Sequence, residues 1–137
     1  MGNLLRQVAD NERLFSAWNE VRDNDLEDGV KSDQVQEFER GALRNLVELS
    51  EQLLAGEYTP GPVVAIEVPK SSGGTRLLAI PAVRDRIVER AVLEVVEPYL
   101  DPVLSPWSFT YRSGLGVNDA IRALTQARKA GARWVAR

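Results

Sequence analysis

The sequence contains no cysteine and no histidine among its 137 residues. The absence of cysteine excludes disulfide bonds, thiolate metal ligands and a cysteine nucleophile. The absence of histidine excludes imidazole ligands and any Ser-His-Asp arrangement. Any chemistry must therefore come from carboxylates, lysine, arginine, hydroxyl groups or the backbone.

Long apolar runs are also missing. No segment approaches the roughly 18 apolar residues of a membrane span, and the N-terminus has no cationic start followed by an apolar stretch. A hydrophobic content of 44% with 27% charged residues is ordinary for a soluble globular chain, and the length suits one domain. We expect a cytoplasmic protein.

The net charge of −3 hides an uneven distribution along the chain. Residues 1–69 carry 6 basic and 14 acidic side chains, a net −8, whereas residues 70–137 carry 11 and 6, a net +5. A basic second half favours a polar partner on one face, and nucleic acid is the commonest partner of such a surface.

The stretch from Tyr58 to Val96 has the clearest local pattern. Residues 64–68 alternate apolar positions with others, Ser71 to Gly74 give a tight turn, and residues 75–80 form a second apolar run. Two extended runs joined through a glycine pair predict a β-hairpin.

This predicted hairpin carries a cation on each arm, Lys70 just before the turn and Arg76 just after it. Pairing of the arms would bring both to one tip. Lysine supplies a compact charge and arginine a planar fork, and together they suit a polyphosphate. The alternative is that both are simply solvated, as charged residues mostly are.

Helical patterns surround the hairpin. We expect a short first helix and a second from about Asn11 to Arg22, with Phe15 and Trp18 packed in the core. A longer helix begins at Asp33, continues through Gly41 at a cost of about 1 kcal/mol and stops at Gly56. The apolar positions of this longer helix form one stripe: Val35, Phe38, Ala42, Leu46, Leu49 and Leu53.

Two more helices are predicted after the hairpin. The first follows Val83 and ends at Pro98, and the second begins at Asn118 or Asp119 and ends at Gly131. Between them, residues 98–116 form a long loop whose aromatic side chains argue against disorder. A final extended run begins at Arg133.

An acidic segment, residues 23–33, has some features of a calcium-binding loop. The alternation of acidic positions begins well, but Gly29 comes one position late and Gln34 stands where the closing glutamate belongs. We therefore favour a solvated loop and expect no metal site.

Several short segments, taken together in this order, resemble the fingers of group II intron-type reverse transcriptases. They are Val68-Pro69-Lys70, the glycine turn, Thr75-Arg76-Leu77-Leu78-Ala79-Ile80-Pro81, Val83-Arg84-Asp85-Arg86-Ile87-Val88, Ser108-Phe109-Thr110-Tyr111-Arg112-Ser113-Gly114 and Arg133-Trp134-Val135. Three positions, Thr110, Tyr111 and Ser113, depart from the family pattern. Pro106 to Phe109 and Gly114 to Gly116 lean toward the bacterial branch associated with CRISPR adaptation.

The resemblance implies an α+β fold in which helices and a hairpin form the fingers of a right-hand polymerase, truncated before the palm. Residues 1–32 would be an N-terminal helical extension, residues 33–131 the fingers, and residues 132–137 the start of the first palm strand. The parent protein would be an RNA-directed DNA polymerase, a nucleotidyltransferase acting on an RNA or DNA template-primer. Self-association through surface left by the missing palm would follow.

The resemblance also assigns roles to residues. Lys70 and Arg76 would bind the triphosphate of the incoming dNTP, and Arg84, Arg86 and Arg112 would contact the template. For these three arginines, the alternative is a salt bridge to a carboxylate such as Asp85 or Glu89.

Catalysis in the family needs palm carboxylates that hold two Mg²⁺ ions. No Asp-Asp pair occurs in this sequence. We therefore expect no catalytic residue and no bound Mg²⁺ in this chain, which alone should bind but not polymerise.

Two rival functions come from other classes. The chain could act as a stand-alone module that binds RNA or single-stranded DNA, for which salt-dependent affinity is expected. Alternatively, the acidic helical first half could dock a protein partner through the stripe from Val35 to Leu53, making this a protein-interaction domain without enzymatic activity.

Overall fold

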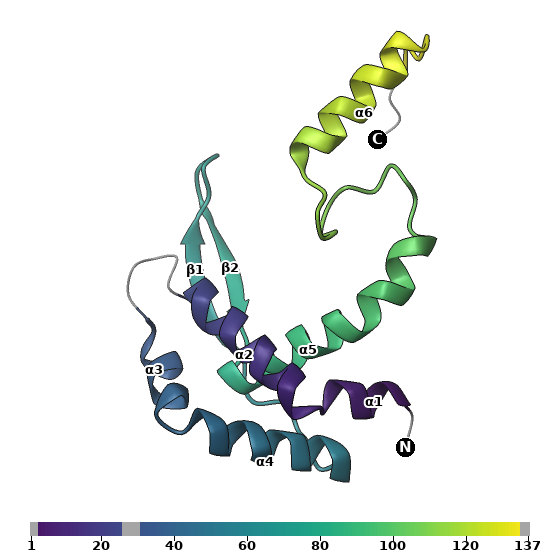
Figure 1. Cartoon of the computed structure of the whole chain (residues 1–137). Coiled ribbons are helices and arrows are strands. Elements are labelled where there is room, and N and C mark those ends of the chain that lie inside the picture. Colours follow the sequence, from purple (N-terminus) through teal and green to yellow (C-terminus); the bar gives the residue numbers. More distant parts are fainter. Residues whose placement is uncertain (1–2, 26–30, 135–137) are drawn as a thin grey trace. The chain divides into compact units, whose positions relative to one another are not determined.

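The computed structural model describes residues 3–25 and 31–134, and within them the α+β class is confirmed. Figure 1 shows the order of the elements along the chain. They are α1 (Asn3–Val8), α2 (Asn11–Asp25), α3 (Asp33–Arg40), α4 (Ala42–Ala55), β1 (Val64–Pro69), β2 (Thr75–Ile80), α5 (Val83–Leu100), the 3-10 helix η1 (Asp101–Val103) and α6 (Val117–Lys129). No described helix has both the length and the apolar character needed to cross a bilayer.

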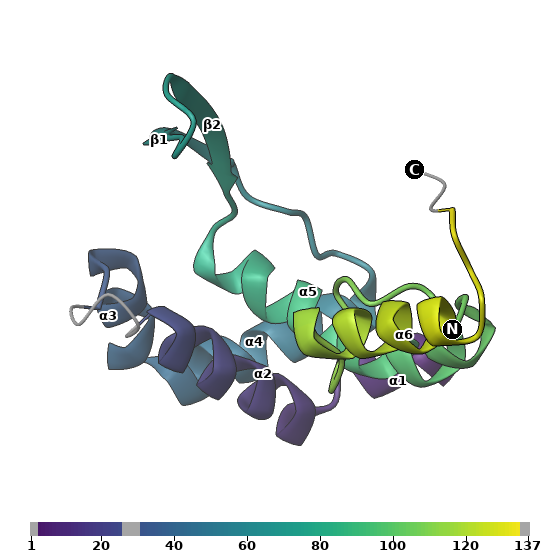
Figure 2. The ribbon, with the colours of Figure 1, turned by 90° about the horizontal axis from the view of Figure 1, so that it is seen from above.

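The chain divides into two units, Met1–Val96 and Glu97–Arg137, and α5 continues from the first into the second. The first unit holds the helices α1 to α4, the hairpin and most of α5. Figure 2 shows the two strands of the hairpin running together to their shared turn. The strands pair antiparallel and only with each other within the described residues.

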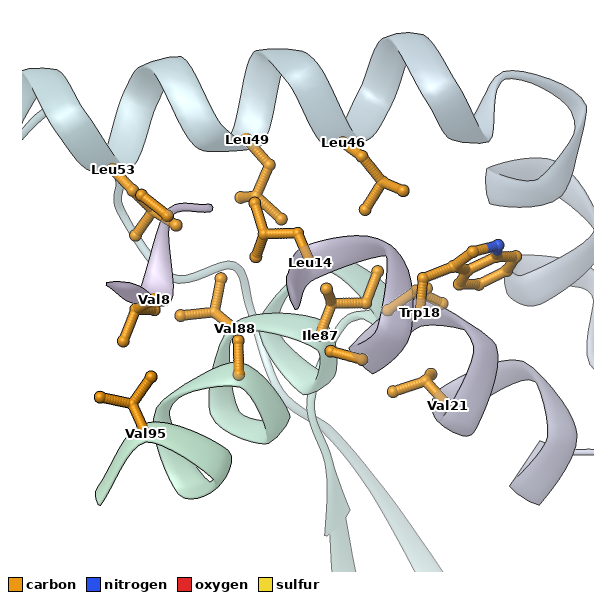
Figure 3. Packing of buried hydrophobic residues seen from close by; sticks show 14 of the residues in the cluster. Val8, Leu14, Trp18, Val21, Leu46, Leu49, Leu53, Ile87, Val88 and Val95 are labelled. Carbon is orange, nitrogen blue, oxygen red and sulfur yellow. The ribbon is translucent and has the colours of Figure 1, made fainter. Parts of the chain in front are cut away.

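The hydrophobic core of the first unit lies among the helices α1 to α5, with α3 contributing Val35 (Figure 3). Trp18 of α2 is 2% exposed and its ring lies 4.8 Å from the ring of Phe38, centroid to centroid. The predicted stripe supplies one side of this core, and α5 supplies another through Ile87, Val88, Ala91 and Val95. The prediction for Phe15 is wrong, because that side chain is 45% exposed.

The single long helix predicted from residue 33 is in fact two helices. Gly41 separates α3 from α4 with φ −130° and ψ 25°, values outside the helical range. Glycine in a helix interior is about 1 kcal/mol less stable than alanine. Here Gly41 lies between two helices rather than inside one, so this destabilisation does not arise. The apolar stripe is preserved across the break, since Val35 and Leu46 both remain buried.

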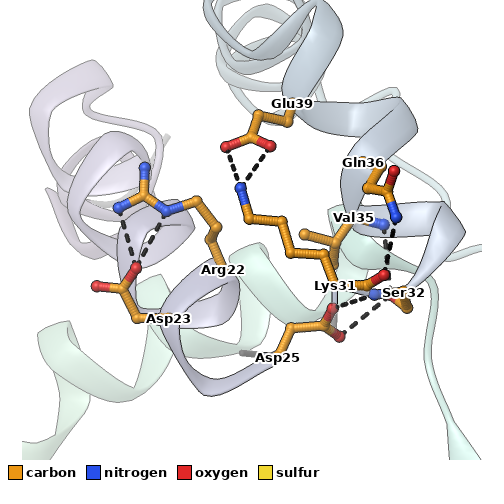
Figure 4. A network of polar contacts seen from close by, with 8 residues as sticks. All are labelled: Arg22, Asp23, Asp25, Lys31, Ser32, Val35, Gln36 and Glu39. Atoms are coloured by element: carbon orange, nitrogen blue, oxygen red, sulfur yellow. Dashed lines mark hydrogen bonds and ion pairs between the residues drawn. The ribbon is translucent and has the colours of Figure 1, made fainter. Parts of the chain in front are cut away.

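The cap of α3 is Ser32 rather than the predicted Asp33 (Figure 4). The Ser32 hydroxyl accepts a hydrogen bond from the Val35 amide at 3.4 Å, and the Asp25 carboxylate accepts from the Ser32 amide at 2.7 Å. Asp25 thus ties the end of α2 to the start of α3. Residues 26–30 of the acidic segment, for which the sequence favours a solvated loop over a calcium site, lie outside the described residues.

Helix ends elsewhere follow the backbone chemistry of glycine and proline. Gly56 ends α4 in the left-handed region at φ 73°, as predicted. Pro98 does not end α5, which continues to Leu100. Pro98 removes the hydrogen bond that an amide at position 98 would have donated to the carbonyl of residue 94, and the helix continues for only two more residues.

The second unit has little interior. η1 and α6 contain no buried residue, and Asp119 at the start of α6 accepts a hydrogen bond from the Gly116 amide at 3.0 Å. Exposed apolar side chains of α6 are Val117, Ile121 and Leu124. The predicted palm strand falls on residues 132–137, of which 135–137 lie outside the described residues, and it stays a prediction.

Candidate functional site

The turn of the hairpin is closed by backbone hydrogen bonds alone. The Lys70 amide donates to the Gly74 carbonyl at 2.9 Å, and the Gly73 amide donates to the Lys70 carbonyl at 3.1 Å. Gly73 and Gly74 have φ values of 88° and 79°, in the left-handed region where a side chain would be strained. This is a three-residue loop with a glycine bulge, one of the common hairpin connections.

The strand register places the two predicted phosphate-binding cations on one face. Val68 pairs with Arg76, so these two side chains share a face of the hairpin, and Lys70 lies two positions beyond Val68. Diagonal neighbours of this kind have Cβ atoms roughly 7–8 Å apart, a spacing that one phosphate chain can bridge. The structure therefore brings Lys70 and Arg76 to the same end of the hairpin.

Both cations are exposed, and neither forms an ion pair within the described residues. The apolar side chains of Val64, Ile66 and Leu78 lie on the same face and are 39–49% exposed. This face, an apolar strip that ends in two unpaired cations, has the chemistry to bind an anion that carries an apolar group.

Arg84 pairs with no carboxylate in the described part of the chain. Its guanidinium lies 5.4 Å from the centre of the Tyr58 ring and donates a hydrogen bond to the Gln52 side chain of α4. Arg84 also lines a groove of about 390 Å³ between α3, α4 and the start of α5, together with Glu37 and Glu48. Its Nε atom is buried and has no hydrogen-bond partner among the described residues.

Arg86 forms a long ion pair with Asp25, 3.6 Å between Nη1 and Oδ1, and its side chain is 24% exposed. The partner comes from the end of α2 rather than from Asp85 or Glu89, the carboxylates that the sequence suggested. Arg86 therefore links α5 to the acidic residue that also holds Ser32.

Arg112 organises the loop after α5. Its guanidinium binds the Asp101 carboxylate through two hydrogen bonds of 2.6 and 3.0 Å, and it also donates to the carbonyls of Ser105 and Ser108. The bond from Arg112 lowers the pKa of Asp101 below its ordinary value, and the same bond raises the pKa of Arg112. Only 12% of the Arg112 side chain is exposed.

Sequence reasoning missed one buried group near the hairpin. Asp85, in the first turn of α5, is 4% exposed and accepts hydrogen bonds from the Tyr58 hydroxyl and the Gly61 amide. The pKa of the Tyr58 hydroxyl is raised above its ordinary value. Burial is the main cause and the hydrogen bond to Asp85 is the second. Nothing in the spacing of these residues signals the contact, because the donors lie 27 and 24 positions before Asp85.

Carboxylates are scattered in the described part of the chain. Residues 3–25 and 31–134 contain no group of three acidic side chains placed to hold a metal ion.

Comparison with known proteins finds intron proteins among the relatives, and no protein-family model matches the chain. Protein YkfC of Escherichia coli is 41% identical over 91 residues, 64% of this chain and 24% of the relative. An uncharacterized 91 kDa protein in the cob intron of Schizosaccharomyces pombe is 27% identical, covering 97% of this chain and 16% of the relative.

A third relative, the putative COX1/OXI3 intron 1 protein of Saccharomyces cerevisiae, is 29% identical over 76 residues, 56% of this chain and 9% of the relative. The chain thus spans less than a quarter of the length of each of these relatives. Two of the three relatives have names that refer to introns. This chain is therefore similar in sequence to intron proteins.

Proposed function

We propose that this chain is the fingers region of an RNA-directed DNA polymerase of the group II intron type. Residues 1–32 would be a helical extension, residues 33–131 the fingers and residues 132–137 the first strand of the palm. Similarity to two proteins named for introns supports this proposal, as does the hairpin with its paired cations. Membership of the CRISPR-associated branch stays a prediction.

The observation that carries the proposal is the placement of Lys70 and Arg76 on one face at the hairpin tip. Both side chains are solvent-exposed and neither is neutralised by a carboxylate in the described structure. The Lys70 ammonium supplies a point charge, whereas the Arg76 guanidinium holds two phosphate oxygens at once. The neighbouring apolar strip would lie beside the nucleoside of a dNTP.

The chemical step would belong to the longer protein. Palm carboxylates holding Mg²⁺ would join the nucleotide to the primer, and we assign no metal-dependent step to this chain. Its own residues would bind and orient the triphosphate.

Template contacts by Arg84, Arg86 and Arg112 remain part of the proposal. In the free chain all three side chains make internal contacts, so Arg86 and Arg112 would act mainly by holding their segments in place. Arg84 lines an open groove and forms no ion pair within the described residues, whereas Arg86 and Arg112 are both paired, so Arg84 is the best placed of the three to reach a template phosphate.

The test is nucleotide binding by a tip variant and a matched control. The double variant Lys70→Ala/Arg76→Ala removes one lysine and one arginine at the tip, and Arg128→Ala/Lys129→Ala removes the same charges from the exposed last turn of α6. Calorimetric titration with deoxyadenosine triphosphate and Mg²⁺ should show affinity lost in the tip variant and retained in the control.

Three other results would reject the proposal. Equal loss in both double variants would show that overall charge, rather than the tip, attracts the nucleotide. Salt-dependent binding of oligonucleotides without any nucleotide binding would favour a stand-alone RNA- or single-stranded-DNA-binding module, and no binding of either would favour a protein-interaction domain.

A further inference from the structure

The hairpin makes few contacts with the helices through its own strands. Of its twelve strand residues, only Val68 and Ile80 are half-buried and the rest are exposed. Within the described residues, no hydrogen bond joins either strand to a helix. The direction of the hairpin is therefore set where it is attached, in the segments that precede Val64 and follow Ile80.

A buried carboxylate joins these two attachments. Asp85 follows the second strand by five residues, and it accepts hydrogen bonds from the Tyr58 hydroxyl at 2.5 Å and from the Gly61 amide at 2.8 Å. Tyr58 and Gly61 both precede the first strand. One side chain thus holds the incoming and the outgoing segment together.

The donors of Asp85 are themselves held by α4. The Gln52 carbonyl accepts hydrogen bonds from the amides of Glu57 and Tyr58, at 2.9 and 3.2 Å. The Gln52 side chain accepts one from Arg84, whose guanidinium covers the Tyr58 ring. The attachment of the hairpin is therefore connected to the helical core through a continuous set of hydrogen bonds.

The fit at this point is tight. A Cβ atom on Gly61 would lie 3.3 Å from the Asp85 Oδ2 atom, closer than ordinary contact distance. The backbone of Gly61 is not in the left-handed region, so it is the close approach to Asp85 that favours glycine here. A buried carboxylate with two short donors is also costly to leave unpaired, which keeps the arrangement closed.

We propose that Asp85 is the positioning residue of the hairpin: by holding the Tyr58 hydroxyl and the Gly61 amide, it fixes the direction in which Lys70 and Arg76 are presented to their ligand. The role for the ligand rests on the proposed function. The role for the hairpin does not, and it is measured separately.

The direct test is a distance measurement between spin labels. Because the chain lacks cysteine, labels attach only at introduced cysteines, Ser72→Cys at the tip and Leu43→Cys on the exposed side of α4. Tyr58→Phe removes one hydroxyl and keeps the ring. Its control, Ser50→Ala, removes a buried hydroxyl that donates to the Ala9 carbonyl at 2.6 Å, a bond that involves neither the hairpin nor the residues that attach it.

We expect the parent and Ser50→Ala to share one narrow distance distribution and Tyr58→Phe to give a broader one. Gly61→Ala should broaden it as well, whereas Gly116→Ala, whose added Cβ meets no atom within 4 Å, should not. An unchanged distribution in both Tyr58→Phe and Gly61→Ala would overturn the proposal. Equal broadening in Ser50→Ala would do the same, because it would indicate a general loss of stability.

Nucleotide affinity in the unlabelled chain completes the test. If the hairpin spends a third of its time in the competent direction, the dissociation constant for deoxyadenosine triphosphate rises about threefold in Tyr58→Phe. Broadening in a chain whose parent binds no nucleotide would reject the proposed function and keep the positioning role. If Tyr58→Phe leaves both the nucleotide affinity and the distance distribution unchanged, the positioning role is rejected and the proposed function is kept.

Discussion

The arginine residues of this chain differ in how many of their N–H donors are used in internal hydrogen bonds. The Arg112 guanidinium donates to one carboxylate and three backbone carbonyls near its own loop, whereas Arg84 leaves its buried Nε without a partner in the described structure. Arg76 forms no ion pair in the described structure and keeps its fork free at the hairpin tip. An arginine whose donors already form internal hydrogen bonds has fewer donors left to bind a ligand. Of these three arginines, Arg76 is the one whose donors are still available for a phosphate.

The ion pair between Arg112 and Asp101 predicts a response to acid. Since the pKa of Asp101 is lowered in the fold, the pair is fully formed above the unfolded value of about 4 and is lost as pH falls through the folded pKa. In a nuclear magnetic resonance titration, the chemical shift of the Arg112 Nε–H proton should keep its hydrogen-bonded value below pH ~4. At still lower pH it should move to the value of a free guanidinium.

Asp101→Asn is the control for this titration. The Arg112 signal should then show no acid transition of its own, because the asparagine amide does not titrate. A transition of the same size in the variant would assign it to another group and remove the ion pair as its cause.

At the scale of elements, two glycines at helix ends have different reasons to be glycine. Gly56 has φ 73° at the end of α4. A Cβ atom added there would contact no other atom within 4 Å, but any residue with a Cβ would be strained in this left-handed conformation. Gly41 has φ −130°, and its added Cβ would lie 3.4 Å from the side chains of Arg44 and Asn45, an ordinary contact. The first glycine is required by conformation and the second is not.

This difference predicts opposite effects of alanine. Gly56→Ala should lower the free energy of unfolding by about 1 kcal/mol, because alanine is strained at positive φ. Gly41→Ala should leave it unchanged or raise it by about 0.5 kcal/mol through the smaller entropy of the unfolded chain. Urea denaturation followed by circular dichroism measures both, and a loss of stability in Gly41→Ala equal to that in Gly56→Ala would contradict the prediction.

Elements with strong local patterns were predictable from the sequence, and contacts between distant segments were not. The alternation in residues 64–68 and the glycine pair predict the hairpin and its turn, and the stripe of α4 predicts its buried face. The break at Gly41 depends on a small local balance. The bond between Tyr58 and Asp85 joins residues 27 positions apart, which no periodicity reveals.

The candidate site follows the same division. Lys70 and Arg76 could be found because a short turn fixes their proximity. The partners of Arg86 and Arg112 could not be named, since Asp25 and Asp101 come together with them only through the packing of α2 on α5 and the course of the loop.

At the scale of the whole molecule, the two units differ in how much apolar surface they bury. The first unit holds every residue of the hydrophobic core found in the described chain. The second exposes Val117, Ile121 and Leu124 along α6, at 76, 55 and 50% of their surface. Contiguous apolar surface of this kind favours association with another surface.

We therefore expect the isolated chain to self-associate. Sedimentation equilibrium should show an apparent mass that rises with concentration, because burying the apolar side of α6 against another copy removes that side from water. Ile121→Asn/Leu124→Asn should reduce the association, whereas Leu43→Asn/Val47→Asn, exposed apolar residues of α4, serves as the matched control. A sample that remains monomeric at every accessible concentration would contradict the prediction.

The hairpin turn has one more consequence. Its closure depends on main-chain groups of Lys70, Gly73 and Gly74, and the side chains of Ser71 and Ser72 form no hydrogen bond within the described residues. These two positions are thus free to vary without loss of the loop. Natural drift or a laboratory library at Ser71 and Ser72 could retune selectivity beside the cations while the architecture that presents them stays constant.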